Sequence, residues 1–578
     1  MEIAVLRSAF LRLASALCFL AAAPLAAATA PQPKLIVAIS VDQFAASVYG
    51  RYSNDFTGGL KRLSEGVAFP VGYQSHAATE TCPGHSTLLT GDHPSHTGIV
   101  GNTWYDRAAS ASVYCVAVAG STDPRDRGPQ KLKATSLGDW LKQAHPGSRV
   151  VSISGKDRAA IMMAGHHPDL VAWWMDGFID NRPVFGFQTS SYAGPAGPEV
   201  QAILKERDDA IAAAWRKAPP QLWPADVPAA CRALEKAHRF GDIEISGTVP
   251  PTAALRSVAQ PGFAQRDDFR NELHASPLYD SLVLDFAADM ARRWKLGSGP
   301  TPDLLAISLS ATDYVGHHYG NGGAEMCEQV HALDRGLGAF LNQIDRLNVP
   351  YMVVLSADHG SVDAPERLRE QGIPAQRFDT ANLVANLNIH LKQVLHVDWQ
   401  PITADDVQAL YITSPGDAAF RARVRDEAVK WLQQQPGVEL VKTREEVAAA
   451  VPPPGKSPAD LTIAERMNES FDPERSADIF VQFDKFATLA WPRGSSIYVA
   501  SHGSPWDYDR QVPILFWWPG VPSITSPATA ETVDIAPTLA AAIHISTPAI
   551  DGHCRPEVVA CAPAAAPAPA PVPGERGR

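Results

Sequence analysis

The chain has 578 residues, a hydrophobic share of 45% and a formal net charge of −12 at pH 7. This length suits one large α/β domain with insertions, or two to three domains, and it allows a sizeable buried core. The acidic balance gives no sign of a basic, nucleic-acid-binding surface.

The first thirty residues have the pattern of a secretory signal. Arg7 and Arg12 precede or enter an apolar stretch from Phe10 to Ala23, and small residues follow up to Ala30. Because this stretch is short and rich in alanine, it is a poor membrane span. We therefore predict a signal peptide over 1–30, a periplasmic or secreted protein, and no stable membrane anchor. An uncleaved anchor is the alternative.

Six cysteines remain after the signal, an even number that permits disulfides in an exported chain. Cys554 and Cys561 are close in sequence, and we predict a bridge between them. The other four cannot be paired from sequence, and Cys82 is equally consistent with a buried thiol.

Continuous apolar runs at 34–41, 148–154, 303–309 and 349–356 indicate strands that are buried on both faces. Helices are expected at 279–294 and 327–344, and further strands at 476–483, 496–500 and 512–517. Pro513 would place the last strand at a sheet edge, or lie at the strand start. The fold class predicted from this order is α/β, with a central, mostly parallel sheet flanked by helices.

Two stretches interrupt the strand–helix order. Residues 160–275 lose it, and residues 362–475 form a looser region with its own helix near 420–434. We interpret both as inserted cap segments within a catalytic domain that spans 31–561. The Pro/Ala-rich segment 562–578 is predicted to be a disordered tail.

Acidic and histidine side chains follow several of the predicted strands. Asp42 follows the first strand, and Asp358 and His359 follow the run that ends at 356. Asp313 and His317 are four residues apart, so one helical turn would put them on the same face. Ligands gather at the carboxyl ends of strands in open α/β sheets. A helix cap or an ordinary core residue remains the alternative for each alone.

Thr81 stands before Pro83 and Gly84 in a pattern typical of a helix start, where free N–H groups favour an anion. An ordinary capping threonine is the alternative. Asn102, in a glycine-rich turn, and Lys156 and Arg158, just after a strand, could contact a phosphate. A turn asparagine and solvated surface charges are the plainer interpretations of these three residues.

Taken together, the Asp and His residues suit zinc. Seven side chains are too many for one tetrahedral ion and about right for two, which together can assist an in-line phosphoryl displacement. The set comprises Asp42, Thr81, Asp313, His317, Asp358, His359 and His502.

The motifs Thr81-Cys82-Pro83-Gly84-His85-Ser86, Asp313 to His317, Asp358-His359-Gly360 and His502-Gly503 resemble the alkaline phosphatase superfamily. More narrowly, they resemble its bacterial threonine-nucleophile, phosphate-irrepressible phosphatases, and the likeness covers about residues 34–553. The resemblance implies two Zn²⁺ per chain. One ion would be held by Asp313, His317 and His502, and the other by Asp42, Asp358, His359 and the Thr81 oxygen. Asn102, Lys156 and Arg158 would contact the phosphate, whereas His85, His318 and His553 would have no ligand role.

The activity implied by this resemblance is hydrolysis of small phosphate monoesters at alkaline pH. Thr81 would form a phosphothreonine intermediate, and the Asp313 side of the site would face the leaving oxygen. A phosphodiesterase or nucleotide pyrophosphatase is the alternative, because it shares the metal ligands and the threonine. A sulfatase is disfavoured because the arginine of its motif is absent, and an exported zinc-binding protein without activity is the non-enzymatic alternative. The physiological substrate and the oligomeric state stay open.

Overall fold

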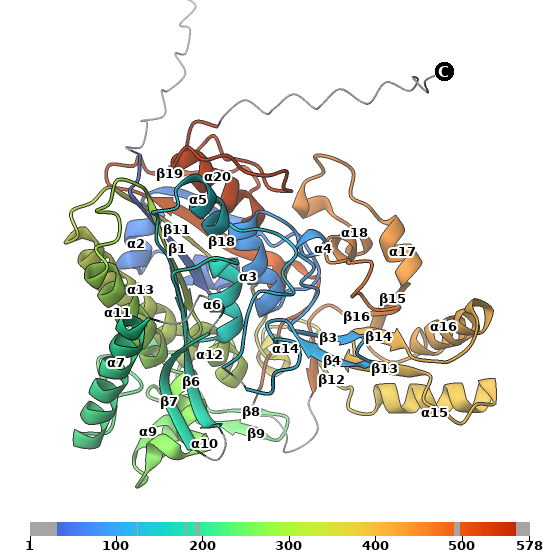
Figure 1. Ribbon diagram of the computed structural model, residues 1–578. Helices are drawn as coiled ribbons and strands as arrows, with labels where there is room; N and C mark the ends of the chain where they lie inside the picture. Colours follow the sequence, from blue (N-terminus) through green and yellow to red (C-terminus); the bar gives the residue numbers. More distant parts are fainter. Residues whose placement is uncertain are drawn as a thin grey trace, which may run out of the picture.

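The computed structural model describes residues 32–561, apart from 124, 180–181, 191, 193–196 and 491–497. Its centre is a nine-stranded sheet with the order β19-β2-β18-β11-β1-β10-β5-β6-β7 (Figure 1). The strands are β1 (Leu35–Val41), β2 (Val67–Tyr73), β5 (Val150–Ser154), β6 (Leu170–Ile179), β7 (Arg182–Thr189), β10 (Asp303–Leu309), β11 (Tyr351–Ser356), β18 (Gln511–Trp517) and β19 (Ile524–Thr525).

The middle of this sheet is parallel. β1 pairs in parallel with β10 on one side and β11 on the other, and β5 continues the parallel order beyond β10. The carboxyl ends of these strands therefore share one edge, and the residues that follow them meet there. This arrangement confirms the predicted central, mostly parallel sheet.

Helices cover both faces of the sheet, as the apolar strands require. Alternate residues of β1 face opposite sides: Val37 and Ile39 belong to one core cluster, Ile36 and Ala38 to another. The first cluster includes α11 (Pro277–Arg293) and α13 (Ala324–Asp345), which lie side by side in Figure 1. The second includes α3 (Thr81–Thr90), α5 (Leu137–Ala144) and α20 (Ile535–Ala542).

Two strand predictions are wrong in detail. β18 is an interior strand, antiparallel to both β11 and β2, and Pro513 is its third residue. The register against β2 shifts between Val512 and Ile514, so an irregularity accommodates the missing N–H of the proline. Of the strand expected at 496–500, residues 498–500 are not in a strand, and 496–497 lie outside the described residues.

The region at 160–275 begins with α6 (Asp157–Ala164), and its strands β6 and β7 extend the central sheet. The rest of it contains α7 (Pro198–Lys217), α8 (Ala229–Arg232), β8 (His238–Phe240), β9 (Ile243–Ile245), α9 (Thr252–Val258) and α10 (Asp267–His274).

The later region forms what we call the arm, residues 376–490, which projects from the body in Figure 1. It has its own apolar core between a four-stranded sheet and two helices. The sheet order is β13 (Ile402–Asp406), β14 (Ala409–Ile412), β16 (Ile479–Phe483) and β15 (Val438–Thr443), and the helices are α15 (Leu383–Leu395) and α16 (Ala418–Leu432). Where the arm leaves and rejoins the body, β12 (Gln376–Asp379) pairs in parallel with β17 (Ala487–Ala490).

Three disulfides tie the described chain together. The predicted bridge between Cys554 and Cys561 is confirmed. Cys82, for which a buried thiol was also considered, pairs with Cys115, and Cys231 pairs with Cys327. Within 32–561, no described helix has the length and apolarity that crossing a bilayer requires. The predicted signal and the predicted tail lie outside the described residues.

Candidate active site

A first group of polar side chains surrounds Asp313. This residue lies in the first turn of α12 (Ala311–Tyr319), directly after β10, and His317 lies one turn later. Asp313 Oδ1 is 3.3 Å from His317 Nε2 and 3.4 Å from His502 Nε2. The geometry therefore places His502 beside the Asp313–His317 pair of α12.

A second group surrounds His359, which follows β11. Its Nε2 lies 3.4 Å from both Asp42 Oδ1 and Asp358 Oδ2, and all three side chains are fully buried. Among the described residues, Asp42 Oδ1 and His359 Nε2 have no hydrogen-bond partner. The ring of His359 stacks on that of His502 at 3.7 Å, so the two groups adjoin. Ligand-type atoms lie within 4.8 Å of one another in Asp42–Asp358–His359 and in Asp313–His359–His502, which places His359 in both sets.

The three imidazoles of these groups are oriented in the same way. The Nδ1 atoms of His317, His359 and His502 lie 2.8, 3.0 and 2.8 Å from the backbone carbonyls of Ala500, Gly360 and Thr79 respectively. A carbonyl accepts only from a protonated Nδ1, so in its neutral form each imidazole presents the lone pair of Nε2 to the carboxylates. Histidine ligands of metals are held in this way by a partner on the other ring nitrogen.

Lys156 contacts a carboxylate of each group. It follows β5, its side chain is 3% exposed, and its Nζ lies 2.6 Å from both Asp42 Oδ2 and Asp313 Oδ2. Burial and the neighbouring Asp358 raise the pKa of Asp42 to about 6, against the effect of Lys156. Burial also acts to raise the pKa of Asp313, but Lys156 and His317 hold it well below its ordinary value. Lys156 thus places a buried positive charge between one carboxylate of each group.

Thr81 is the first residue of α3, not its N-cap. The N-cap is Glu80, which makes no side-chain cap hydrogen bond. Gly84 is required one turn later, because a Cβ there would lie 2.0 Å from the carbonyl oxygen of Asp358. The helix that carries the threonine is thus packed directly onto the second group.

Two of the predicted phosphate-contacting residues lie beside Thr81. Arg158 Nη2 contacts Thr81 Oγ1 at 3.4 Å. The side-chain oxygen of Asn102 accepts from the N–H of Cys82 at 2.8 Å, and the backbone N–H of Asn102 donates to Glu80 Oε2 at 2.8 Å. Asn102 is thereby fixed at the start of α3.

Arg158 is itself held by a small network that sequence reasoning missed. Its Nη1 contacts the hydroxyl of Tyr114 at 3.4 Å, and that hydroxyl donates to Asp157 Oδ1 at 2.6 Å. Arg127 completes the network by donating to Asp157 Oδ2 at 3.2 Å. Burial acts to lower the pKa of Arg158, but Tyr114 and other partners raise it well above its ordinary value, so the guanidinium stays charged.

Gln43 and His85 also contribute without a clear signal in the sequence. The backbone N–H of Gln43 donates to Asp358 Oδ1 at 3.1 Å, and its amide group contacts Asp313 Oδ1 at 2.6 Å. It has a φ of 65°, a left-handed conformation that turns it back over the site. His85, for which no ligand role is implied, lies with Nδ1 3.0 Å from Asp358 Oδ2 and 2.9 Å from the carbonyl of Thr81. It thus connects the threonine to the second group.

A family model described as type I phosphodiesterase / nucleotide pyrophosphatase matches residues 36–504. The chain belongs to this family. Alkaline phosphatase PhoK from Sphingomonas sp is 40% identical over 545 residues, which cover 91% of each chain. Alkaline phosphatase PhoD from Zymomonas mobilis is 39% identical over 534 residues, covering 90% of this chain and 87% of the relative.

The fold of this family member agrees with a solved structure. The crystal structure of alkaline phosphatase PafA superposes with a TM-score of 0.75 at 26% identity, and covers 92% of this chain and 99% of that one. The resemblance to the alkaline phosphatase superfamily is therefore confirmed, as is the prediction of an enzyme of that type. The roles of individual site residues stay predictions.

Proposed function

We propose that this chain is a zinc-dependent alkaline phosphatase that hydrolyses phosphate monoesters, with Thr81 as the nucleophile. One observation carries the proposal. The Thr81 hydroxyl contacts Arg158 at the start of a buried helix, and that helix packs against the second of two adjoining carboxylate–imidazole groups. The names of the relatives PhoK and PhoD support the same activity.

The residues of both groups fit a divalent metal such as zinc. In the second group, the buried atoms Asp42 Oδ1 and His359 Nε2 have no hydrogen-bond partner within the described part of the chain, which is costly unless something else satisfies them. Oxygen and imidazole nitrogen are ligands that zinc accepts. Asp313, His317 and His502 would hold one ion, and Asp42, Asp358, His359 and the Thr81 oxygen the other. When bound, such ions supply Lewis acidity that favours the deprotonated form of a hydroxyl group.

The chain's own residues would then position the reaction. Thr81 Oγ1 would form a bond to phosphorus while the bond to the ester oxygen breaks. A water molecule would cleave the resulting phosphothreonine, releasing inorganic phosphate and restoring the threonine hydroxyl. Arg158 and Asn102, both next to Thr81, would bind the non-bridging oxygens of the phosphoryl group. Lys156 would hold Asp42 and Asp313 in place.

The position of Arg158 favours monoesters over the diesters in the family's description. A monoester dianion has three non-bridging oxygens and a diester has two, so a buried guanidinium beside the nucleophile has more to bind in a monoester. The diesterase alternative predicts the reverse preference.

The test is a comparison of initial rates on p-nitrophenyl phosphate, its bis-ester and a sulfate ester, with bound metal measured on the same samples. We expect the monoester to be fastest, and Thr81→Ala to form no acid-stable phosphoenzyme while remaining folded. Turnover that is undiminished in Thr81→Ala would refute the proposed nucleophile. Faster cleavage of the bis-ester would favour the diesterase.

We also propose that the protein is exported. The six cysteines after the predicted signal form three disulfides, a feature that persists in oxidising compartments such as the periplasm. Fractionation of the producing cells, with N-terminal sequencing of the mature protein, tests both the location and the cleavage.

A further inference from the structure

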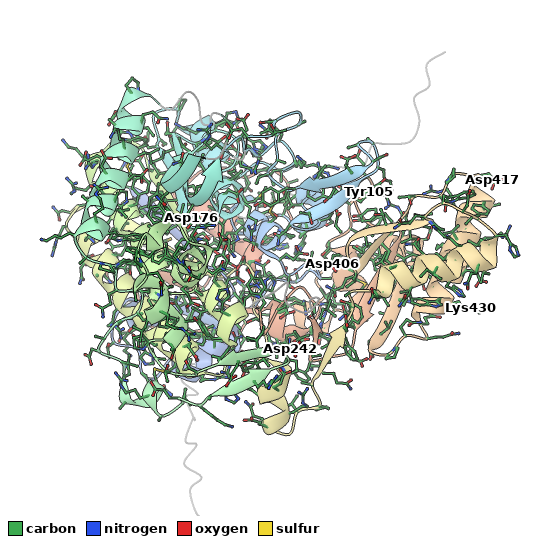
Figure 2. All side chains as sticks on the ribbon, turned by 90° about the horizontal axis from the view of Figure 1, so that it is seen from below. Tyr105, Asp176, Asp242, Asp406, Asp417 and Lys430 are labelled. Carbon is green, nitrogen blue, oxygen red and sulfur yellow. A yellow bond between two sulfur atoms is a disulfide. The ribbon has the colours of Figure 1, made fainter. Side chains whose placement is uncertain are left out.

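A cavity of about 300 Å³ lies between the arm and the catalytic body. On the body side its wall includes His502, Gly503 and Ser504. On the arm side it includes residues 405–408, which are the last two residues of β13 and the turn into β14. Figure 2 shows Asp406, the last residue of β13, at the junction of arm and body, far from Asp417 and Lys430 at the distal part of the arm. We call this cavity the arm pocket.

The arm pocket borders the candidate active site at the His502 loop. His502 donates to the carbonyl of Thr79, two residues before the nucleophile, and the Thr79 hydroxyl donates to the carbonyl of Ser504 at 2.8 Å. From the arm, Gln408 Nε2 donates to the carbonyl of Gly503 at 3.1 Å. One wall of the pocket therefore belongs to the group around Asp313, the side of the site that would face the leaving oxygen.

The lining of the arm pocket is acidic. Asp405 and Asp406 are exposed and line both this cavity and a smaller adjoining one of about 100 Å³, which Glu80 also lines. Among the described residues that line either cavity, none is a lysine or an arginine. Lys485 lies next to the lining, with its ammonium 5.9 Å from the ring of Trp506.

A second feature of the lining indicates a place for a ligand. Thr488 and Asp509 line the pocket and are 4% and 1% exposed, and neither Thr488 Oγ1 nor Asp509 Oδ1 has a hydrogen-bond partner among the described residues. The other oxygen of Asp509 is already occupied, since it accepts from the N–H and the hydroxyl of Ser504 at 2.9 and 2.6 Å. An unpaired buried acceptor is costly, and a donor group in the pocket would relieve that cost.

We propose that the arm pocket is the leaving-group subsite and that it selects phosphate monoesters of amino alcohols, whose leaving group carries an ammonium. This inference rests on the proposed function. An ammonium has three N–H donors and a positive charge, which match a wall of carboxylates and unpaired acceptor oxygens. A carboxylate or a further phosphate on the leaving group would meet like charge there and be disfavoured.

Three esters of nearly equal size test the charge preference. They are O-phosphoethanolamine, with an ammonium, 2-hydroxyethyl phosphate, with a neutral hydroxyl, and 2-phosphoglycolate, with a carboxylate. We expect kcat/KM to fall in that order, by roughly three- to tenfold at each step at low salt, and the spread to shrink as salt screens exposed charges.

A double variant tests whether the acidic residues of the arm pocket cause the preference for an ammonium-bearing leaving group. Asp405→Asn/Asp406→Asn should lower the ratio of kcat/KM for phosphoethanolamine to that for hydroxyethyl phosphate by roughly three- to tenfold. The matched control is Asp398→Asn/Glu439→Gln, which removes two exposed charges elsewhere on the arm and should leave the ratio unchanged.

Failure of the proposed subsite can be distinguished from failure of the proposed phosphatase activity. If all three esters are cleaved at equal rates, or if both double variants shift the ratio equally, the subsite is refuted while the phosphatase stands. If p-nitrophenyl phosphate is not hydrolysed either, the proposed function fails and the subsite fails with it.

Discussion

Arg158 contacts the hydroxyl oxygen of Thr81 at 3.4 Å, which brings a buried guanidinium to the atom predicted to attack phosphorus. The contact is made from α6, while Thr81 lies on α3, so two helices at the same sheet edge assemble it.

Arg158→Ala should slow monoester hydrolysis far more than diester hydrolysis. Loss of one charged hydrogen bond to a transition state costs about 1.5–3 kcal/mol, or roughly ten- to a hundredfold in kcat/KM. The measurement is kcat/KM on p-nitrophenyl phosphate and its bis-ester, with bound zinc determined in parallel. Arg292→Ala, on the exposed face of α11, serves as the control. Equal losses on both esters would show that Arg158 serves the fold.

Lys156→Met should destabilise the metal-free protein more than the zinc-loaded one. Removing the ammonium leaves Asp42 and Asp313 buried without their cation, at a cost of about 3–5 kcal/mol. Bound zinc would supply the missing positive charge. Urea unfolding with and without chelator measures both differences. A loss of stability that is the same in both conditions would contradict this electrostatic account.

His502→Ala should lower bound zinc from about two ions per chain to about one, and should sharply reduce turnover. Its Nε2 faces Asp313, and its ring stacks on His359. Elemental analysis after gel filtration gives the metal content, and full chelation should abolish activity until zinc is restored. His553→Ala, an exposed histidine outside both groups, should keep its zinc.

His85→Gln should weaken zinc binding by roughly ten- to a hundredfold without removing a ligand. Nδ1 of the buried imidazole contacts both Asp358 Oδ2 and the carbonyl of Thr81, while Nε2 lies 2.8 Å from Ser308 Oγ. Competition with a chromophoric chelator measures the affinity, and circular dichroism checks the fold. An unchanged affinity in a folded variant would show that Asp358 needs no such support.

Glu272→Gln should stabilise the protein more at pH 8 than at pH 5. Burial, opposed by the hydrogen bond from Tyr319, raises the pKa of Glu272 from 4.5 to about 7. The folded chain therefore holds this proton when the unfolded chain has lost it. The resulting stabilisation is complete below pH 4.5 and is lost as the pH rises to about 7. The gain in unfolding free energy from the variant should grow by roughly 1–3 kcal/mol between pH 5 and 8, as measured by urea unfolding. A gain independent of pH would contradict this titration.

The residues around the two groups were predictable to the extent that they follow strands. Asp42, Asp313 and Asp358 come directly after apolar runs, and parallel strands bring such residues to one edge whatever lies between them. Lys156 and Arg158 were also expected there, since they follow β5. The sequence pattern cannot reveal that Lys156 lies between two carboxylates, because that contact depends on side-chain packing across three strands.

Other features depend on tertiary structure that no local pattern records. Pro513 indicated an edge strand, but neighbouring strands accommodate it through a register shift. We interpreted the region of β6 and β7 as an insertion because its aromatic residues show no clear alternation of apolar and polar positions. In the structure, both strands extend the central sheet. Gln43, next to Asp42, adopts a left-handed conformation and donates its backbone N–H to Asp358. Nothing in the sequence around a glutamine indicates this conformation or this contact.

The parallel pairing of β12 with β17 holds together the two points where the arm leaves and rejoins the body. The arm thus begins after His359 and ends before His502, and contributes no member of the seven-residue cluster. In evolutionary terms, it is an exchangeable module: a lineage can lengthen, shorten or recombine residues 376–490 while the residues around Thr81 stay in register. New leaving-group preferences could then arise through changes in one segment, without rebuilding the chemistry beneath it.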